Sequence, residues 1–224
     1  MNCPVRRYNV CEPLGPDRQR ELYEHQQTWK RGQYLYREGY PVGPILKIIT
    51  GIVSVSKTLP DGRRQILDFF FAGELCGYLE TEGRYTFEGQ AITDVTTCAF
   101  TRSRFKAFTA AHDDLTEIVR ATLAWKLEGI SRHAVVLGQL SAKERVATFL
   151  CWFGARSGER GGTPSVRLPM ARGDIADYLG LTIETVSRTL SKLRMLGIIE
   201  VSDTTITVLD AARLASLASP LDEH

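Results

Sequence analysis

The sequence has no long hydrophobic run and almost no net charge, and both absences narrow the choice of function. No apolar stretch among its 224 residues approaches the ~20 residues that cross a bilayer, and no amino-terminal apolar segment resembles a signal peptide. The formal net charge is only +2, which is too small to indicate a nucleic-acid partner by itself. We therefore expect a cytoplasmic protein without a membrane partner, whose five cysteines are reduced.

Histidine is also scarce, and the four histidines are scattered: His25, His112, His133 and His224. None of them lies in the β-rich segment 32–105 that we expect to form the roll, whereas a cupin-like metalloenzyme needs inward-facing histidines inside its barrel. The same absence argues against haem. Since no histidine pairs with a nucleophile in a known motif and no phosphate-binding glycine loop occurs, we expect no enzyme and no catalytic residues.

The most informative segment, residues 170–197, has two apolar stripes at helical spacing. The stripes and the glycine between them are Ile175, Ala176 and Leu179, then Gly180, then Val186, Leu190 and Leu193. Because apolar residues at this spacing pack inward, the segment predicts two helices joined by a tight turn. This is the helix-turn-helix layout, whose second helix enters the major groove of DNA.

Three polar side chains lie opposite the second stripe, near a helix start that Thr182 caps: Glu184, Ser187 and Arg188. An arginine fork matches the two acceptors on a guanine edge, a carboxylate accepts from the amino group of cytosine, and a serine hydroxyl serves either edge. These three residues are therefore the candidates for reading DNA bases. The alternative is a solvated Glu–Arg pair on an ordinary helix.

The residues after the second helix complete a winged helix. Gly197 ends the helix, and residues 198–201 and 205–209 alternate around a Ser202–Asp203 turn, which predicts a hairpin that contacts the DNA backbone. The region also has a mild excess of basic residues, each of which is otherwise a solvated surface charge. The candidates for backbone contacts are Arg172, Thr182 and Lys192, with Lys143, Arg145, Arg167 and Arg194 as further basic residues.

The stretch DIADYLGLTIETVSRTL, residues 174–190, resembles the CRP/FNR family of transcription regulators, and within it the FNR and FixK branch. In that branch the pattern E-x-x-S-R reads half-sites of the type TTGAT, and it matches Glu184, Ser187 and Arg188. The cyclic-AMP branch has an arginine before the glutamate and a glycine before the final arginine, where this chain has Ile183 and Ser187. The resemblance extends over residues 30–209 and is most specific here.

The first half has short β-rich runs separated by glycines, which predicts an antiparallel roll. One hairpin is clear, because residues 52–57 and 65–71 flank the turn sequence LPDG. The resemblance implies the β-roll of cyclic-nucleotide-binding domains, in which an Arg-Ser pair holds the phosphate of cyclic AMP. Tyr85 and Thr86 occupy those positions here, and a neutral tyrosine cannot pair with the anion, so we expect no cyclic AMP. The alternative is that the adjacent Arg84 supplies the missing positive charge and that the roll binds cyclic AMP.

A predicted helix from about Asp114 to Leu140 has two apolar faces, one through Leu115 and Val136 and one through Leu127. Two faces suit a helix that packs on its own roll and meets a partner, and the family's dimerisation helix lies here, so we expect a homodimer. The alternative is a helix buried within a monomer. Residues 141–144 then fit the capping box S-x-x-E and start a new helix after a hinge.

The five cysteines are the only clue to a signal. The resemblance places Cys98 at a cluster-binding position of FNR, and Cys3 and Cys11 reproduce part of the C-x2-C-x7-C run of rhizobial FnrN-type members. These supply three of the four thiolates that a [4Fe-4S] cluster normally takes, with Cys76, a non-cysteine ligand or a cysteine upstream of Met1 as the fourth. The alternative is that the cysteines are unrelated to a cofactor, as in the FixK branch.

We therefore expect an α+β fold with three parts: a sensory β-roll with an amino-terminal extension over residues 1–112, a dimerisation helix over 113–140, and a winged helix-turn-helix over 141–224. The resemblance implies a homodimeric activator that contacts RNA polymerase and binds palindromes such as TTGAT-N4-ATCAA in response to low oxygen or redox state. It also implies control of nitrogen fixation or anaerobic respiration genes. The alternative of another class is a ligand-binding or enzymatic β-roll whose carboxy-terminal helices only pack.

Overall fold

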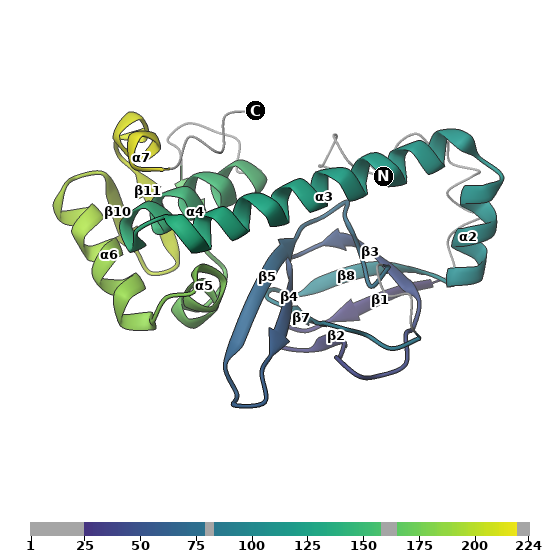
Figure 1. The fold of residues 1–224 in the computed structure, drawn as a ribbon. Helices are drawn as coiled ribbons and strands as arrows, with labels where there is room; N and C mark the ends of the chain where they lie inside the picture. The colour runs from purple at the N-terminus through teal and green to yellow at the C-terminus, as the bar shows by residue number, and fades with distance from the viewer. Residues whose placement is uncertain (1–24, 79–82, 158–164, 219–224) are drawn as a thin grey trace. The chain divides into compact units, whose positions relative to one another are not determined.

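The computed structural model describes residues 25–78, 83–157 and 165–218, and contacts divide the chain into two compact units, residues 1–128 and 129–224 (Figure 1). The division falls inside one long helix, α3 (Asp113–Gln139), so each unit includes part of that helix. Among the described ranges, no helix is both long enough and apolar enough to cross a membrane.

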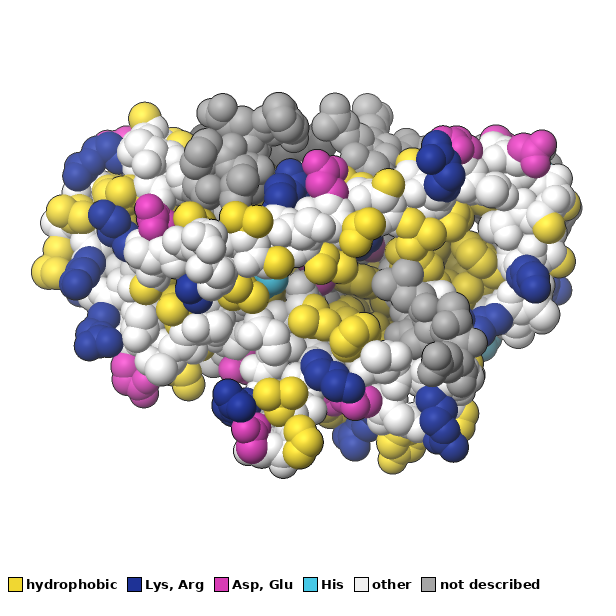
Figure 2. Space-filling view, viewed as in Figure 1, with side chains coloured by type: hydrophobic (Ala, Val, Ile, Leu, Met, Phe, Trp, Pro, Cys, Tyr) yellow, Lys and Arg dark blue, Asp and Glu magenta, His cyan; other side chains and the backbone are white. Residues whose placement is uncertain are grey.

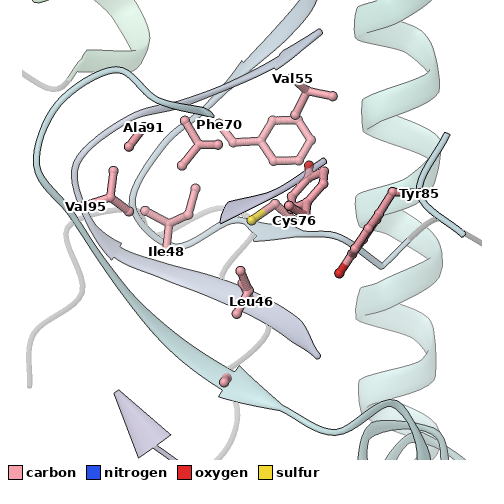
Figure 3. Close-up of a cluster of buried hydrophobic side chains, with 11 residues drawn as sticks. Leu46, Ile48, Val55, Phe70, Cys76, Tyr85, Ala91 and Val95 are labelled. Atoms are coloured by element: carbon pink, nitrogen blue, oxygen red, sulfur yellow. The ribbon is translucent and has the colours of Figure 1, made fainter. Parts of the chain in front are cut away.

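Two four-stranded antiparallel sheets form the roll of the first unit. One sheet has the order β1 (His25–Trp29), β8 (Val95–Phe100), β3 (Ile45–Thr50) and β6 (Leu75–Cys76). The other has the order β2 (Tyr34–Tyr36), β7 (Glu88–Ala91), β4 (Val53–Thr58) and β5 (Arg64–Phe70). Alternate side chains of both sheets meet in a buried cluster that includes Ile48, Val55 and Phe70 (Figure 3). The predicted antiparallel roll is confirmed.

The predicted hairpin of the roll is formed by β4 and β5, in which Val53 pairs with Phe70 and Thr58 with Arg64. At its turn the Asp61 carboxylate accepts a hydrogen bond of 3.1 Å from the backbone N–H of Arg63. The next residue in the turn, Gly62, has a φ of 87°, which glycine adopts without a steric penalty. The turn residues therefore reverse the chain as the sequence predicts.

The roll both begins and ends earlier than the sequence predicts. β1 pairs with β8 along its whole length, so the roll starts before the predicted segment 32–105 and includes one histidine, His25, opposite Ala99. The His25 side chain is exposed and lies 2.8 Å from the Gln27 amide nitrogen, so it does not face the interior. At the other end, Phe105 belongs to a helix, α2 (Arg102–Ala110), that was not predicted from the sequence. The polar strand HQQTW has no apolar alternation, which explains why it was missed.

A second buried cluster joins β3, β6 and β8 to α2 and to the first part of α3. Its members include Ile45, Phe100, Phe105 and Leu115. Further along α3, the buried Lys126 extends its ammonium group to Asp68 Oδ2 at 2.6 Å and to Glu74 Oε1 at 3.0 Å. Apolar packing and this ion-paired group therefore both hold the first part of α3 on the roll.

The second unit combines helices with a three-stranded antiparallel sheet of order β10-β11-β9. Its elements after α3 are α4 (Ala142–Ser157), β9 (Ser165–Arg167), α5 (Arg172–Leu179), α6 (Ile183–Met195), β10 (Ile199–Ser202), β11 (Thr205–Val208) and α7 (Ala211–Leu217). The predicted hairpin after α6 is confirmed as β10–β11, and its turn residue Asp203 has a φ of 51°. The short elements β9 and α7 were not predicted.

The predicted capping box at the start of α4 is also confirmed. The backbone N–H of Ser141 donates to Glu144 Oε2 at 2.7 Å, and the backbone N–H of Glu144 donates to the Ser141 hydroxyl at 3.5 Å. These bonds satisfy two groups that a helix start leaves without partners inside the helix. The capping box therefore starts α4 as a helix separate from α3.

Candidate nucleic-acid interface

The pair α5 and α6 is joined by a tight turn that begins at Gly180. Gly180 has a φ of 60° and ends α5 in the left-handed conformation that glycine favours. On the inner side of α6, Val186, Leu190 and Leu193 are at most 4% exposed. The predicted inward stripe and the predicted turn are both confirmed.

The outer side of α6 carries the three candidate base-reading residues. Glu184, Ser187 and Arg188 are all exposed, and they follow one another at the three- and four-residue spacing that shares a helix face. They lie in the first two turns of α6, the part of a recognition helix from which side chains reach base edges. The structure therefore brings these residues together, while their contacts with DNA stay a prediction.

A row of hydroxyl groups leads from the start of α6 to Arg188. The Thr182 hydroxyl caps the helix by accepting from the backbone N–H of Thr185 at 3.2 Å, and the two threonine hydroxyls lie 3.1 Å apart. Nη2 of Arg188 in turn donates to the Thr185 hydroxyl at 3.3 Å. Thr185 is not among the residues predicted from the sequence, although its position three residues before Arg188 is a signal for such a contact.

The start of α6 also keeps Glu184 ionised. A hydrogen bond from its own backbone N–H, then the Thr182 hydroxyl and then the positive charge of Arg188 lower the pKa of the Glu184 carboxyl. An ionised carboxylate only accepts hydrogen bonds, which matches the amino group of cytosine and does not match an acceptor on a base edge.

The candidate phosphate contacts divide into two groups. Lys143, Arg167, Lys192 and Arg194 are exposed. In Figure 2, Lys and Arg side chains gather over the region of α6 that Figure 1 labels. Arg172 is half-buried, and burial lowers the pKa of its guanidinium group. Exposed cations near α6 suit contacts with phosphates.

Arg145 is not a free surface charge, and its prediction as a candidate phosphate contact is wrong. Its guanidinium group is directed at backbone carbonyls of Leu137, Leu140 and Leu179, at 2.7–2.9 Å. The side chain is half-buried by these contacts. A guanidinium group that is bound in this way is not available to a phosphate.

In the roll, Tyr85 and Thr86 occupy the positions that we compared with the phosphate clamp of cyclic-AMP binders, and they make other contacts. Tyr85 is buried, stacks on Tyr36 with ring centroids 4.6 Å apart, and accepts a hydrogen bond of 2.8 Å from the Gly43 backbone through its hydroxyl (Figure 3). Thr86 is exposed, and the neighbouring Arg84 donates to the Gly39 carbonyl at 2.6 Å. An aromatic ring thus stands in the roll interior where the clamp would need a cation.

The described cysteines do not form a cluster site. In β3, Leu46 pairs with Cys76 and the next residue, Lys47, pairs with Cys98, so the two thiols are on opposite faces of the sheet. Cys76 lies in the roll core, whereas Cys98 packs towards the second cluster with α2 and α3. Cys76 therefore cannot serve as a ligand beside Cys98.

The other predicted ligands, Cys3 and Cys11, lie outside the described residues. Within the described ranges, no three His, Cys, Asp or Glu residues gather as a metal site would require. The described residues alone therefore do not fit a [4Fe-4S] cluster.

Comparison with known proteins identifies the family to which this architecture belongs. The sequence matches the cyclic nucleotide-binding domain family over residues 26–112 and the Crp-like helix-turn-helix domain family over residues 144–217. Nitrogen fixation regulation protein FixK of Bradyrhizobium diazoefficiens is 37% identical, over 97% of this chain and 93% of its own. The chain belongs to the CRP/FNR family of transcription regulators.

Other members of the CRP/FNR family agree with this assignment. Transcriptional activator protein FnrL of Cereibacter sphaeroides is 28% identical, over 95% of this chain and 89% of its own. The solved structure of FixK2 from Bradyrhizobium japonicum has a TM-score of 0.80 and 33% identity, over 87% of this chain and 97% of that one. The protein is thus a DNA-binding transcription regulator and not an enzyme.

Proposed function

We propose that this regulator is a homodimer that binds palindromes of the type TTGAT-N4-ATCAA, activates transcription through RNA polymerase, and responds to low oxygen or redox state. The observation that carries the DNA part is the exposure of Glu184, Ser187 and Arg188 together at the start of α6. A two-fold dimer requires an inverted repeat whose half-sites lie about one helical turn apart. The named roles of the relatives, nitrogen fixation regulation and transcriptional activation, support activation of nitrogen fixation or anaerobic respiration genes.

Each of the three side chains has a separate task at a half-site. Arg188, steadied by Thr185, presents its fork to the N7 and O6 acceptors of guanine, and the ionised Glu184 accepts from the amino group of cytosine. Ser187 donates to or accepts from a neighbouring edge. Lys192, Thr182 and Arg172 contact phosphates, which adds affinity without sequence preference.

A gel-shift titration of wild type, Arg188→Ala and Lys192→Ala tests these tasks. Wild type should bind the palindrome tightly and lose about 1–3 kcal/mol when the G·C pair of one half-site is changed. Arg188→Ala should abolish that discrimination. Lys192→Ala should weaken palindrome and scrambled DNA alike and lower the salt dependence. Equal losses on both DNAs for the two variants would contradict the assignment.

The homodimer part of the proposal depends on an exposed apolar row along α3. Leu123, Leu127 and Ile130 are 37%, 67% and 49% exposed, and they recur at the spacing of one helix face. An apolar row left in water favours association with a matching surface, and a two-fold dimer offers the same row.

We expect Leu127→Glu to shift the protein from dimer to monomer in sedimentation velocity experiments. Leu59→Glu, at a turn residue of the roll that is 42% exposed, introduces the same charge away from α3 and should leave the dimer intact. If Leu127→Glu remains a dimer at low micromolar concentration, α3 is not the interface.

The sensory part is tested by comparing DNA binding with and without air. Protein purified without oxygen should bind the palindrome more tightly than the same sample after exposure to air, and iron and sulfide analysis should show whether a cluster accompanies the change. Cys98→Ser should remove the response, while Cys151→Ser should keep it. Equal affinity in both atmospheres would contradict an oxygen or redox signal.

A further inference from the structure

Arg145, in the first turn of α4, donates to three main-chain carbonyls at or directly after the ends of two other helices. Nε donates to Leu140 at 2.9 Å, Nη2 to Leu137 at 2.7 Å and Nη1 to Leu179 at 2.9 Å. Leu137 lies in the last turn of α3, and Leu140 directly follows that helix. Leu179 is the last residue of α5. One side chain thus joins the ends of α3 and α5 to α4.

Helix ends explain why an arginine is suited to this place. The last four carbonyls of a helix have no donor within the helix, and they carry the negative end of its dipole. A guanidinium group supplies a permanent positive charge and several N–H donors in a fixed plane. The three bonds of Arg145 therefore define a direction for α5 relative to the end of α3, which a flexible ammonium group cannot do.

Two further contacts tie α5 to the same place. A Cβ atom on Gly180 would lie 3.4 Å from Leu137 Cδ2 and 3.5 Å from Arg145 Nη1, so the end of α5 packs closely on both residues. Tyr178 of α5 stacks on His133 of α3 with ring centroids 4.0 Å apart, and on Trp152 of α4 at 5.5 Å. Helices α3, α4 and α5 thus meet through an aromatic stack beside the arginine.

We propose that Arg145 is a positioning residue that sets the direction in which the DNA-reading helix leaves the end of α3. Only Gly180, Leu181 and Thr182 separate α5 from α6, so the placement of α5 fixes that of Glu184 and Arg188. The inference rests on the proposed binding of a homodimer to a palindrome. When α5 and α6 are held in one direction on the α3 of each protomer, the two base-reading faces lie a fixed distance apart. That distance suits two half-sites about one helical turn apart.

This role has a signature that loss of stability or of a phosphate contact does not share. A loosened reader still recognises one half-site, but the second half-site must be met by a reader without a fixed direction, so the gain from bivalent binding falls. The preference for one spacer length falls with it. A phosphate contact, by contrast, contributes equally at every spacer length, and its loss lowers the salt dependence.

The test compares wild type with Arg145→Lys and Arg145→Gln, and uses Lys106→Gln as the control because Lys106 is an exposed basic residue of α2, outside the candidate DNA contacts. Dissociation constants are measured by fluorescence anisotropy for the N4 palindrome, for palindromes with N3, N5 and N6 spacers, and for a single half-site. Circular dichroism verifies that each variant is folded.

Both Arg145 variants should lose about tenfold in the ratio of full-site to half-site affinity, a modest part of a bivalent gain, and should discriminate less between spacers. Lys106→Gln should keep the wild-type ratio. If an Arg145 variant does not fold, His133→Leu, which removes the stack on Tyr178, should show the same loss in a smaller amount.

Three results overturn the inference: an unchanged ratio with unchanged spacer preference, equal weakening at all four spacer lengths, or a salt slope lowered by about one for each half-site bound, as for a lost phosphate contact. Failure of the wild-type protein to bind any of the palindromes would instead contradict the proposed function, so the two failures are distinguishable.

Discussion

The hydroxyl of Thr185 lies 3.3 Å from Nη2 of Arg188, one helical turn further along α6. This contact directs an exposed guanidinium group back towards the start of the helix. Thr185→Val keeps the shape of the side chain and removes the acceptor, so Arg188 becomes freer in solution. We expect the discrimination of the palindrome against a G·C substitution to fall by about 0.5–1.5 kcal/mol, roughly twofold to thirteenfold.

The measurement is a pair of gel-shift titrations on palindrome and substituted DNA. Ser191→Ala removes an exposed hydroxyl from the same helix away from its start and should retain full discrimination. A Thr185→Val protein that discriminates as wild type does would show that Arg188 orders itself on the base without help.

The ammonium group of Lys126 is a buried charge of the first unit, with its side chain 7% exposed between Asp68 and Glu74. It also lies 3.6 Å from the centre of the Phe70 ring. Lys126→Ala leaves two carboxylates without their cation in a site that excludes water. Removal of one partner from a buried ion pair costs about 3–5 kcal/mol, and we expect a loss of that size in urea unfolding.

Lys106→Ala supplies the control, because Lys106 is exposed on α2. Adding Asp68→Asn to Lys126→Ala should recover part of the lost stability, since a neutral amide is cheaper to bury than an unpaired carboxylate. A loss below about 1 kcal/mol for Lys126→Ala would mean that the pair behaves like a surface salt bridge.

The features that could be predicted from the sequence are those that depend on residues close together in the chain. The stripe of Val186, Leu190 and Leu193 defines α6, and the LPDG turn defines the β4–β5 hairpin, because each pattern lies within a few residues. The Ser141–Glu144 capping box is equally local. For the same reason the exposed face of α6 follows from residue spacing alone.

What the sequence did not predict depends on partners far along the chain or on backbone atoms. Lys126 meets Asp68 across 58 positions, and Arg145 meets the Leu179 carbonyl across 34. A carbonyl has no side-chain signature, so Arg145 resembled any other basic surface residue. β9 has only three residues, Ser165–Arg167, and becomes a strand because it pairs with β11. Tertiary contacts override weak local preferences in such short segments.

Two glycines should respond to the same substitution with opposite signs. A Cβ atom on Gly89 would lie 2.5 Å from the ring of Tyr36, which stacks on Tyr85 in the roll core. Gly89→Ala should therefore destabilise the protein by about 1–3 kcal/mol, as overpacked cores do. Gly129 lies inside α3 with nothing within 4 Å of such an atom, so Gly129→Ala should stabilise it by about 0.5–1 kcal/mol.

Thermal unfolding of both variants checks this pair, with the shift in Tm as the readout. A Gly89→Ala protein as stable as wild type would mean that Tyr36 moves without penalty, and would question the rigidity of the aromatic pair that fills the roll.

The capping box at the hinge should make stability depend on pH. The Ser141 hydroxyl, the Ser141 backbone N–H and then the charge of Lys143 hold the pKa of Glu144 below its ordinary value of 4.5. Because the pKa is lower in the folded protein than in the unfolded chain, ionised Glu144 stabilises the fold at pH values above about 4.5, and this contribution is lost as pH falls through the folded value.

Glu144→Gln keeps a side chain that fits the capping box but does not ionise. The difference in unfolding free energy between wild type and Glu144→Gln should therefore be largest near neutral pH and should shrink as pH is lowered below about 4.5. Carboxyl titration by NMR should show a Glu144 midpoint that rises towards its ordinary range in Ser141→Ala. A pH-independent difference would mean that Glu144 acts through its shape and not through its charge.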